Sequence, residues 1–119
     1  MTLRLYTGRI GYRGEDGLPV TRRVVTHPAG LPFAPSDGLL SWGLAERHAG
    51  RGDAMWPTYA ARYTAEMRAS YRQHRAAWDA LLARDEVTLL CFCHGPDRCH
   101  RGVLAGLLVR CGAVYEGER

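Results

Sequence analysis

The sequence predicts a single small α/β domain over residues 1–119, built on a sheet that contains parallel strands. Three observations support this prediction. A chain of 119 residues can bury one modest core but not two. Its 46% hydrophobic and 24% charged residues are ordinary values for a soluble globular protein. The candidate segments follow one another as strand, helix, long helical region, strand, helix and strand, the alternation typical of α/β domains.

The N-terminal residues predict a strand and a loop. Leu3–Tyr6 alternates between apolar and polar residues, which is the period-two pattern of a strand. The next segment, Thr7–Tyr12, contains two glycines and Arg9, so it is a candidate phosphate-binding loop as well as an ordinary turn. The Asp16–Pro19 segment predicts a further turn, because glycine and proline interrupt regular structure there.

Two helical segments occupy the middle of the chain. Ser36 predicts the N-cap of a first helix, which ends where Gly50–Asp53 forms a flexible connection. A longer segment, Thr58–Ala83, carries aromatic and apolar residues every three or four positions, and we interpret this stripe, Tyr59 included, as core. One unbroken helix there would be about 39 Å long at about 1.5 Å per residue, so we expect a bend or break near Ser70–Gln73.

The chain is organised around one strand-to-helix unit near its C-terminus. Val87–Leu90 is an apolar run bounded by charged residues and a Gly-Pro turn, which predicts an inner, buried strand. An amphipathic helix is expected from Asp97, and its first turn carries Cys99, His100 and Arg101. Gly112 predicts the end of that helix, and Ala113–Glu116 predicts a short final strand.

Three of the four cysteines and two of the five histidines lie within ten residues at this strand-to-helix junction. Metal binding is one interpretation, because thiolate sulfur and imidazole nitrogen are ligands of zinc and iron. The side chains that could form such a site are Cys91, Cys93, Cys99 and His100. The Cys-x-Cys spacing permits a tetrahedral site without being diagnostic of one, since Cys-x-x-Cys is more usual for zinc.

A reactive thiolate or an anion site is the second interpretation. The N-terminus of a helix carries a partial positive charge, which should lower the pKa of Cys99 and attract an anion. Cysteines would act as thiolates and a histidine as the general base. The residues assigned to this chemistry are Cys99, His100 and Cys93, and those assigned to the anion are Arg101, Arg9 and Thr7.

A structural role is the third interpretation, because free cysteine packs well as a small buried hydrophobe. We expect Cys111 to be of this kind. We also expect it to react more slowly than Cys99, since it lies near the C-terminus of the same helix, where the dipole opposes ionisation.

The motif at this junction resembles a known family. Leu89-Leu90-Cys91, a short turn and then Cys99-His100-Arg101 before a leucine-rich helix are similar to the domain of unknown function 488 family. The Cys91-Phe92-Cys93 doublet further resembles a related group of small phage and bacterial proteins. The resemblance implies a Rossmann-like α/β fold, with a mostly parallel sheet and flanking helices. It implies no settled activity; some members of the family lack the cysteines and are linked to metal.

We therefore expect a protein that binds or acts on a phosphorylated, nucleotide-like small molecule at this cysteine, histidine and arginine site. The alternative is a non-catalytic module that binds zinc or iron, or that binds nucleic acid. All 16 basic residues are arginine, but a net charge of +4 without a basic run is only a weak indication of nucleic acid. No apolar run approaches the roughly 20 residues of a membrane span, and the N-terminus lacks the apolar segment of a signal peptide. Together with clustered cysteines that suit a reducing compartment, this predicts a cytoplasmic protein without a membrane partner.

Overall fold

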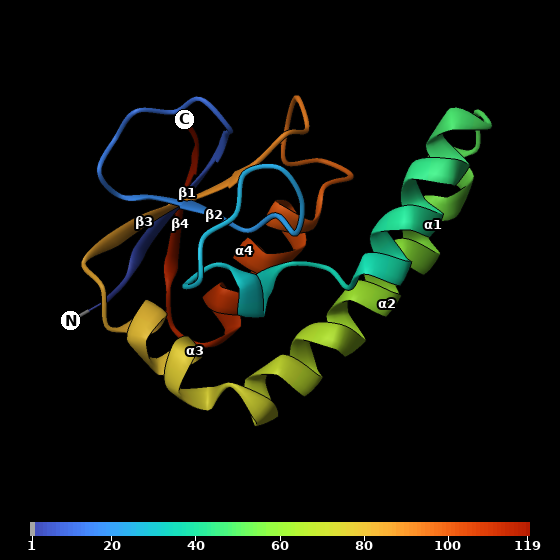
Figure 1. Cartoon of the computed structure of the whole chain (residues 1–119). Coiled ribbons are helices and arrows are strands. Elements are labelled where there is room, and N and C mark those ends of the chain that lie inside the picture. Colours follow the sequence, from blue (N-terminus) through green and yellow to red (C-terminus); the bar gives the residue numbers. More distant parts are fainter. Residues whose placement is uncertain (1) are drawn as a thin grey trace.

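A four-stranded, all-parallel sheet organises the computed structural model, which describes residues 2–119 (Figure 1). The strands are β1 (Arg4–Arg9), β2 (Gly17–Pro19), β3 (Glu86–Cys91) and β4 (Val114–Glu118). Their order in the sheet is β2-β3-β1-β4, so that β3 and β1 are the inner strands. The predicted α/β class, with a parallel sheet and flanking helices, is confirmed.

Strand β3 is buried along almost its whole length, as an inner strand requires. Leu89 and Leu90 are both buried, which confirms the prediction for this segment. Because side chains alternate along a strand, Val87 and Leu89 join the main core on one face of the sheet. On the other face the Thr88 hydroxyl donates to the Asp16 carboxylate at 2.6 Å. Thus both faces of β3 are covered, one of them by a loop.

Helices cover the first of these faces in successive layers. They are α1 (Asp37–His48), α2 (Gly52–Gln73), α3 (Arg75–Leu82) and α4 (His100–Arg110), with a short 3-10 helix at Leu31–Phe33. Helix α4 packs on β1, β3 and β4, α2 packs on α4, and α1 packs on α2. Figure 1 shows α1 and α2 side by side as a hairpin that extends away from the sheet. Within residues 2–119, no helix is both long enough and apolar enough to cross a membrane.

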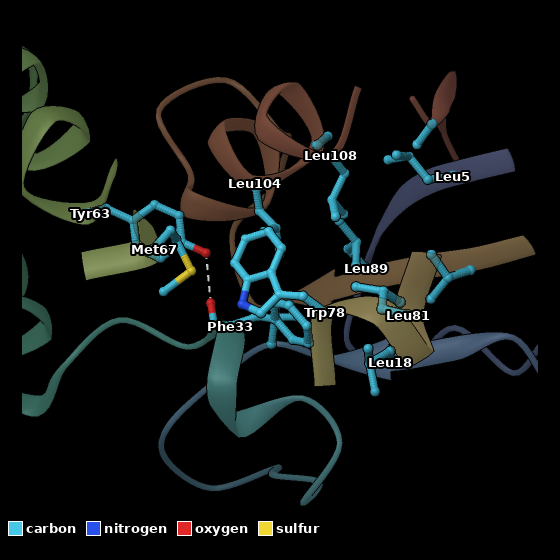
Figure 2. Packing of buried hydrophobic residues seen from close by; sticks show 14 of the residues in the cluster. Leu5, Leu18, Phe33, Tyr63, Met67, Trp78, Leu81, Leu89, Leu104 and Leu108 are labelled. Atoms are coloured by element: carbon cyan, nitrogen blue, oxygen red, sulfur yellow. Dashed lines mark hydrogen bonds between the residues drawn. The ribbon is translucent and has the colours of Figure 1, made fainter. Parts of the chain in front are cut away.

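The core between the sheet and the helices also contains polar atoms, and these are paired (Figure 2). The Tyr63 hydroxyl donates to the Phe33 carbonyl at 2.6 Å, which ties α2 to the 3-10 helix. The Trp78 indole donates to the Ser70 hydroxyl at 3.0 Å, and the Trp78 ring meets the Phe33 ring edge-on at 4.9 Å. Buried hydroxyl and indole groups therefore keep the hydrogen bonds that burial would otherwise remove.

Two segments in the first half differ from the sequence prediction. Gly17–Pro19 forms strand β2 rather than a turn. This strand is at the edge of the sheet, where the missing N–H of proline need not interrupt a ladder. Helix α2 begins at Gly52, so the predicted flexible connection is already helical at Asp53. The Asp53 carboxylate lies in the first turn, where the helix dipole stabilises it.

The helical predictions are confirmed in part. Ser36 caps α1 as expected, since its hydroxyl accepts a hydrogen bond from the Leu39 N–H at 3.2 Å. The expected break near Ser70–Gln73 is present, because α2 ends there and α3 begins two residues later. Helix α4, however, begins at His100 rather than at Asp97. The residues before it form a loop, in which the positive φ of 55° at Arg98 is incompatible with a right-handed helix.

Truncation of the β3 core tests this arrangement. We expect Leu89→Ala to lower the free energy of unfolding by about 2–5 kcal/mol, because Leu89 is fully buried and its removal leaves a cavity. The matched control is Val109→Ala on the exposed side of α4, for which we expect a change of about 0.5 kcal/mol or less. Urea unfolding followed by circular dichroism measures both. Equal effects of the two substitutions would contradict the position of β3.

Candidate metal and ligand site

Three cysteines converge where β3 ends. Cys91 is the last residue of β3, Cys93 follows in the loop, and Cys99 is the N-cap residue of α4. Their three Sγ atoms all lie within 4.8 Å of one another. All three are free thiols; Cys91 and Cys99 are buried, and Cys93 is half-buried. The strand-to-helix unit thus brings together three of the four residues that the sequence assigned to a metal.

The loop between β3 and α4 folds back over the helix and returns Cys99 to the strand. A Cβ atom on Gly102 would lie only 2.3 Å from the Pro96 carbonyl oxygen, so this close approach requires glycine. The Cys99 N–H also donates to the Pro96 carbonyl at 3.3 Å. These two contacts explain locally why residues eight apart in the sequence share one sulfur cluster.

His100 contacts the cluster through a single cysteine. Its Nε2 lies 2.7 Å from the Val20 carbonyl oxygen, and we assign the ring proton to this nitrogen. The other nitrogen, Nδ1, is then an acceptor, 3.8 Å from the Cys91 sulfur. Burial lowers the pKa of His100, outweighing its hydrogen bond to Val20, so the ring is neutral. His100 therefore contacts Cys91, but within residues 2–119 the set of possible ligand atoms that lie within 4.8 Å of one another contains only the three thiols.

Two guanidinium groups lie beside the sulfur atoms. Nη1 of Arg101 is 3.3 Å from the Cys99 sulfur, and this buried arginine also donates to both carboxylate oxygens of Glu118 at 2.8 and 3.4 Å. Nη1 of Arg47, from the last turn of α1, is 3.5 Å from the Cys93 sulfur. Positive charge at these distances stabilises a thiolate or a metal–thiolate centre.

The structure does not gather the predicted anion-binding residues on one open surface. Thr7 is buried, and its hydroxyl is 2.7 Å from the Tyr115 hydroxyl. Arg9 is exposed at the end of β1. Arg101 has 0% exposed surface and is bonded to Glu118, so it offers no donor to an anion in solvent. The Arg101 side chain reaches Glu118 of β4 instead of joining Arg9 and Thr7 at an anion site.

Thiol chemistry also differs from the expectation based on the helix dipole. Hydrogen bonds from the Cys93 and Cys99 thiols lower the pKa of Cys91. The contact with Cys91 raises the pKa of Cys99, which remains the donor, and burial raises it further. Burial and the contacts with the other two thiols thus act against ionisation of Cys99, which is opposite to the expectation from the helix dipole. Cys111 is exposed after the end of α4 rather than packed, so the structural role predicted for it is also wrong.

A cavity of about 470 Å³ is lined by all three cysteines, and we call it the cysteine cavity. Small-molecule sites commonly have this size. Its outer walls include the exposed apolar side chains of Val24, Leu44 and Phe92. Arg47 and Tyr59 line it as well, from α1 and α2. The cavity therefore combines a sulfur-rich wall, an apolar mouth and a few polar groups, the composition of a site for a small molecule with one polar end.

Comparison with known families agrees with the motif. A family model for DUF488-N3a, described as the active DUF488-N3 subclade, matches residues 30–112, well over half of the chain. The chain belongs to the DUF488 family. The matched segment contains the cysteine cluster and the residues of the α1–α2 hairpin that line the cavity, whereas β1 and β4 lie outside it. Comparison with curated proteins and with solved structures gave no match.

Sequence reasoning missed three residues of this DUF488 site. Arg47 was not singled out, Tyr59 was interpreted as core, and Glu118 lies beyond the predicted end of the last strand. One signal was present for Tyr59. Gly43 lies within the first predicted helix, and a Cβ there would be 2.7 Å from the Tyr59 ring. A glycine inside a helix marks close approach of another element, which here is the ring that lines the cavity.

The Arg101–Glu118 pair predicts a pH dependence of stability. Burial raises the pKa of Glu118, but hydrogen bonds from Arg101 and Thr7 outweigh burial and hold the pKa below its usual value of 4.5. A carboxyl group whose pKa is depressed by folding stabilises the protein above its unfolded pKa, and this contribution is lost as the pH falls through the folded pKa. We expect Glu118→Gln to be less stable than wild type at about pH 7, with a smaller difference at about pH 3. Urea unfolding at both pH values measures this. A difference that does not change with pH would contradict the ion pair.

Proposed function

We propose that this DUF488 domain binds zinc or iron through Cys91, Cys93 and Cys99, and that the metal centre holds a phosphorylated small molecule in the cysteine cavity. The observation that carries the proposal is the gathering of three free thiols within 4.8 Å on the wall of a cavity. Structural zinc sites close all four ligand positions with protein, whereas sites that act on a ligand keep one position open. Three cysteines facing a cavity match the second kind.

The sulfur geometry suits a metal with little rearrangement. Zinc–sulfur bonds of about 2.3 Å place tetrahedral ligands roughly 3.8 Å apart, so sulfurs within 4.8 Å need to move inwards only slightly. Three thiolates around a divalent ion leave a net negative charge, and the Arg47 and Arg101 guanidiniums beside the sulfurs offset it. The Nε2–H group of His100 donates to the Val20 carbonyl, which holds the ring beside Cys91.

The charge around the cavity supports an anionic ligand. Three arginines line it, and each has a partner: Arg22 donates to the Pro35 carbonyl at 2.7 Å, Arg23 pairs with Asp37 at 2.7 Å, and Arg47 donates through Nη2 to the Arg98 carbonyl at 2.6 Å. Arg47 lies next to the sulfur cluster without an acidic partner within residues 2–119. A phosphate bound at the open position of the metal would therefore find its cationic neighbour in Arg47.

Metal-free thiol chemistry is the second candidate, because the same guanidinium groups also favour a thiolate. In that case His100, whose Nδ1 lies beside the Cys91 sulfur, is the general base for Cys91. Cys93 and Cys99 are the neighbouring thiols in the cluster. The two candidates differ in one measurement, since only the first requires bound metal.

Metal analysis of protein purified without chelator is the direct test. We expect about one zinc or iron per chain in the wild type, and loss of most of that metal in Cys91→Ser and Cys99→Ser, because each removes a thiolate ligand. Cys111→Ser is the matched control, since Cys111 is exposed and outside the cluster, and it should retain the metal. A wild-type protein that is isolated metal-free and takes up no added zinc, iron or cobalt would exclude the metal centre.

Ligand binding is tested by calorimetry with inorganic phosphate, phenyl phosphate and a panel of nucleotides. We expect Arg47→Gln to weaken binding about tenfold or more, because a hydrogen bond to a charged group contributes about 1.5–3 kcal/mol. Arg84→Gln removes the same charge from an exposed position outside the cavity, and it should bind as the wild type does. Equal affinities of the two variants would remove Arg47 from the ligand site.

A further inference from the structure

We propose that the Tyr59 hydroxyl is a hydrogen-bond donor built into the cysteine cavity for an oxygen atom of the bound ligand. The side chain is 7% exposed and lines the cavity. Within residues 2–119, the Tyr59 hydroxyl makes no hydrogen bond. Every fully buried side-chain oxygen or nitrogen in these residues has a hydrogen-bond partner, so the Tyr59 hydroxyl is not fully buried. The hydroxyl is therefore accessible to solvent, and the cavity is the surface that Tyr59 lines.

The ring that carries this hydroxyl is held on both sides. Trp56 stacks on it with ring centroids 5.6 Å apart and an interplanar angle of 19°. On the side of α1, Gly43 lies so close that even one added carbon would come within 2.7 Å of the ring. A side chain fixed in this way donates a hydrogen bond without first losing much rotational freedom, and this is the form that preorganised binding groups take.

Neighbouring groups favour donation over acceptance. Burial raises the pKa of Tyr59, so the hydroxyl keeps its proton. Arg47, also on the cavity wall, supplies only donors. The polar groups contributed by α1 and α2 thus point to a ligand that brings acceptor oxygens, as a phosphate monoester does, while the apolar mouth suits the remainder of that ligand.

Tyr63, one helical turn along α2, shows what a structural tyrosine looks like in this domain. Its ring is fully buried, and its hydroxyl donates to the Phe33 carbonyl at 2.6 Å (Figure 2). The hydroxyl of Tyr63 is used within the fold, whereas that of Tyr59 is left for the cavity. The two residues therefore make a matched pair for removing one hydroxyl from the same helix.

The experiment is calorimetry of metal-loaded protein with phenyl phosphate. We expect Tyr59→Phe to bind phenyl phosphate about tenfold or more weakly than wild type, because a hydrogen bond to a charged oxygen is lost. Its metal content and thermal unfolding should match those of wild type, since phenylalanine keeps the packing with Trp56. Tyr63→Phe should unfold at lower temperature, because the Phe33 carbonyl loses its partner, but should keep the wild-type affinity for phenyl phosphate.

This inference rests on the proposed function, and the outcomes separate the two. If wild type binds phenyl phosphate and Tyr59→Phe binds it equally well, the role of Tyr59 is wrong and the proposed function stands. If wild type retains metal but binds no phosphate ester at all, the phosphorylated ligand and the role of Tyr59 are both wrong. Weaker binding by Tyr63→Phe, to the same extent as by Tyr59→Phe, would show a general loss of packing and would also overturn the inference.

Discussion

The arrangement of this DUF488 domain depends on β3, a strand that is buried on both faces and hydrogen-bonded along both edges. Its two neighbours run parallel to it, so no connection between them can be a tight hairpin. After Cys91 the chain must leave the carboxyl edge of the sheet and turn back through α4 before it can pair again as β4. The loop with Cys93 and the cap residue Cys99 lie on this return path. Convergence of the three sulfurs is thus a consequence of parallel topology as well as of sequence spacing.

A buried guanidinium links the fold to the cluster. Enclosing a charge costs several kcal/mol unless it is paired and hydrogen-bonded. Arg101 meets both conditions, because its donors reach the carboxylate of Glu118 and the sulfur of Cys99. The carboxylate comes from the last strand, which pairs with β1 at Thr7. The C-terminal strand is therefore both an edge of the sheet and the support that fixes the charge beside one sulfur.

Local patterns were sufficient to predict the parts of this structure that depend on neighbouring residues. The apolar run of β3, the cap at Ser36, the break after α2 and the cluster at the strand-to-helix junction all follow from residues close in sequence. Arg47, Tyr59 and Glu118 could not be assigned in this way, because each reaches the site only through the packing of its own helix or strand against a distant one. The exposure of Cys111 could not be predicted either, because it depends on whether a segment distant in sequence packs against the C-terminal end of α4.

The site is therefore assembled from two parts with different origins. The β3–α4 unit supplies the sulfurs, and its geometry follows from a short, continuous segment of chain. The α1–α2 hairpin supplies Arg47 and Tyr59, and the absence of a side chain at Gly43 leaves room for the Tyr59 ring between its two helices. Under the proposed function, a change in the hairpin would alter ligand binding while the sulfur cluster keeps its shape. Conversely, a change in the cluster would remove the proposed metal ligands while the contact between Gly43 and Tyr59 stays in place. The two parts can therefore be changed separately, because the contacts that position each of them lie in different elements.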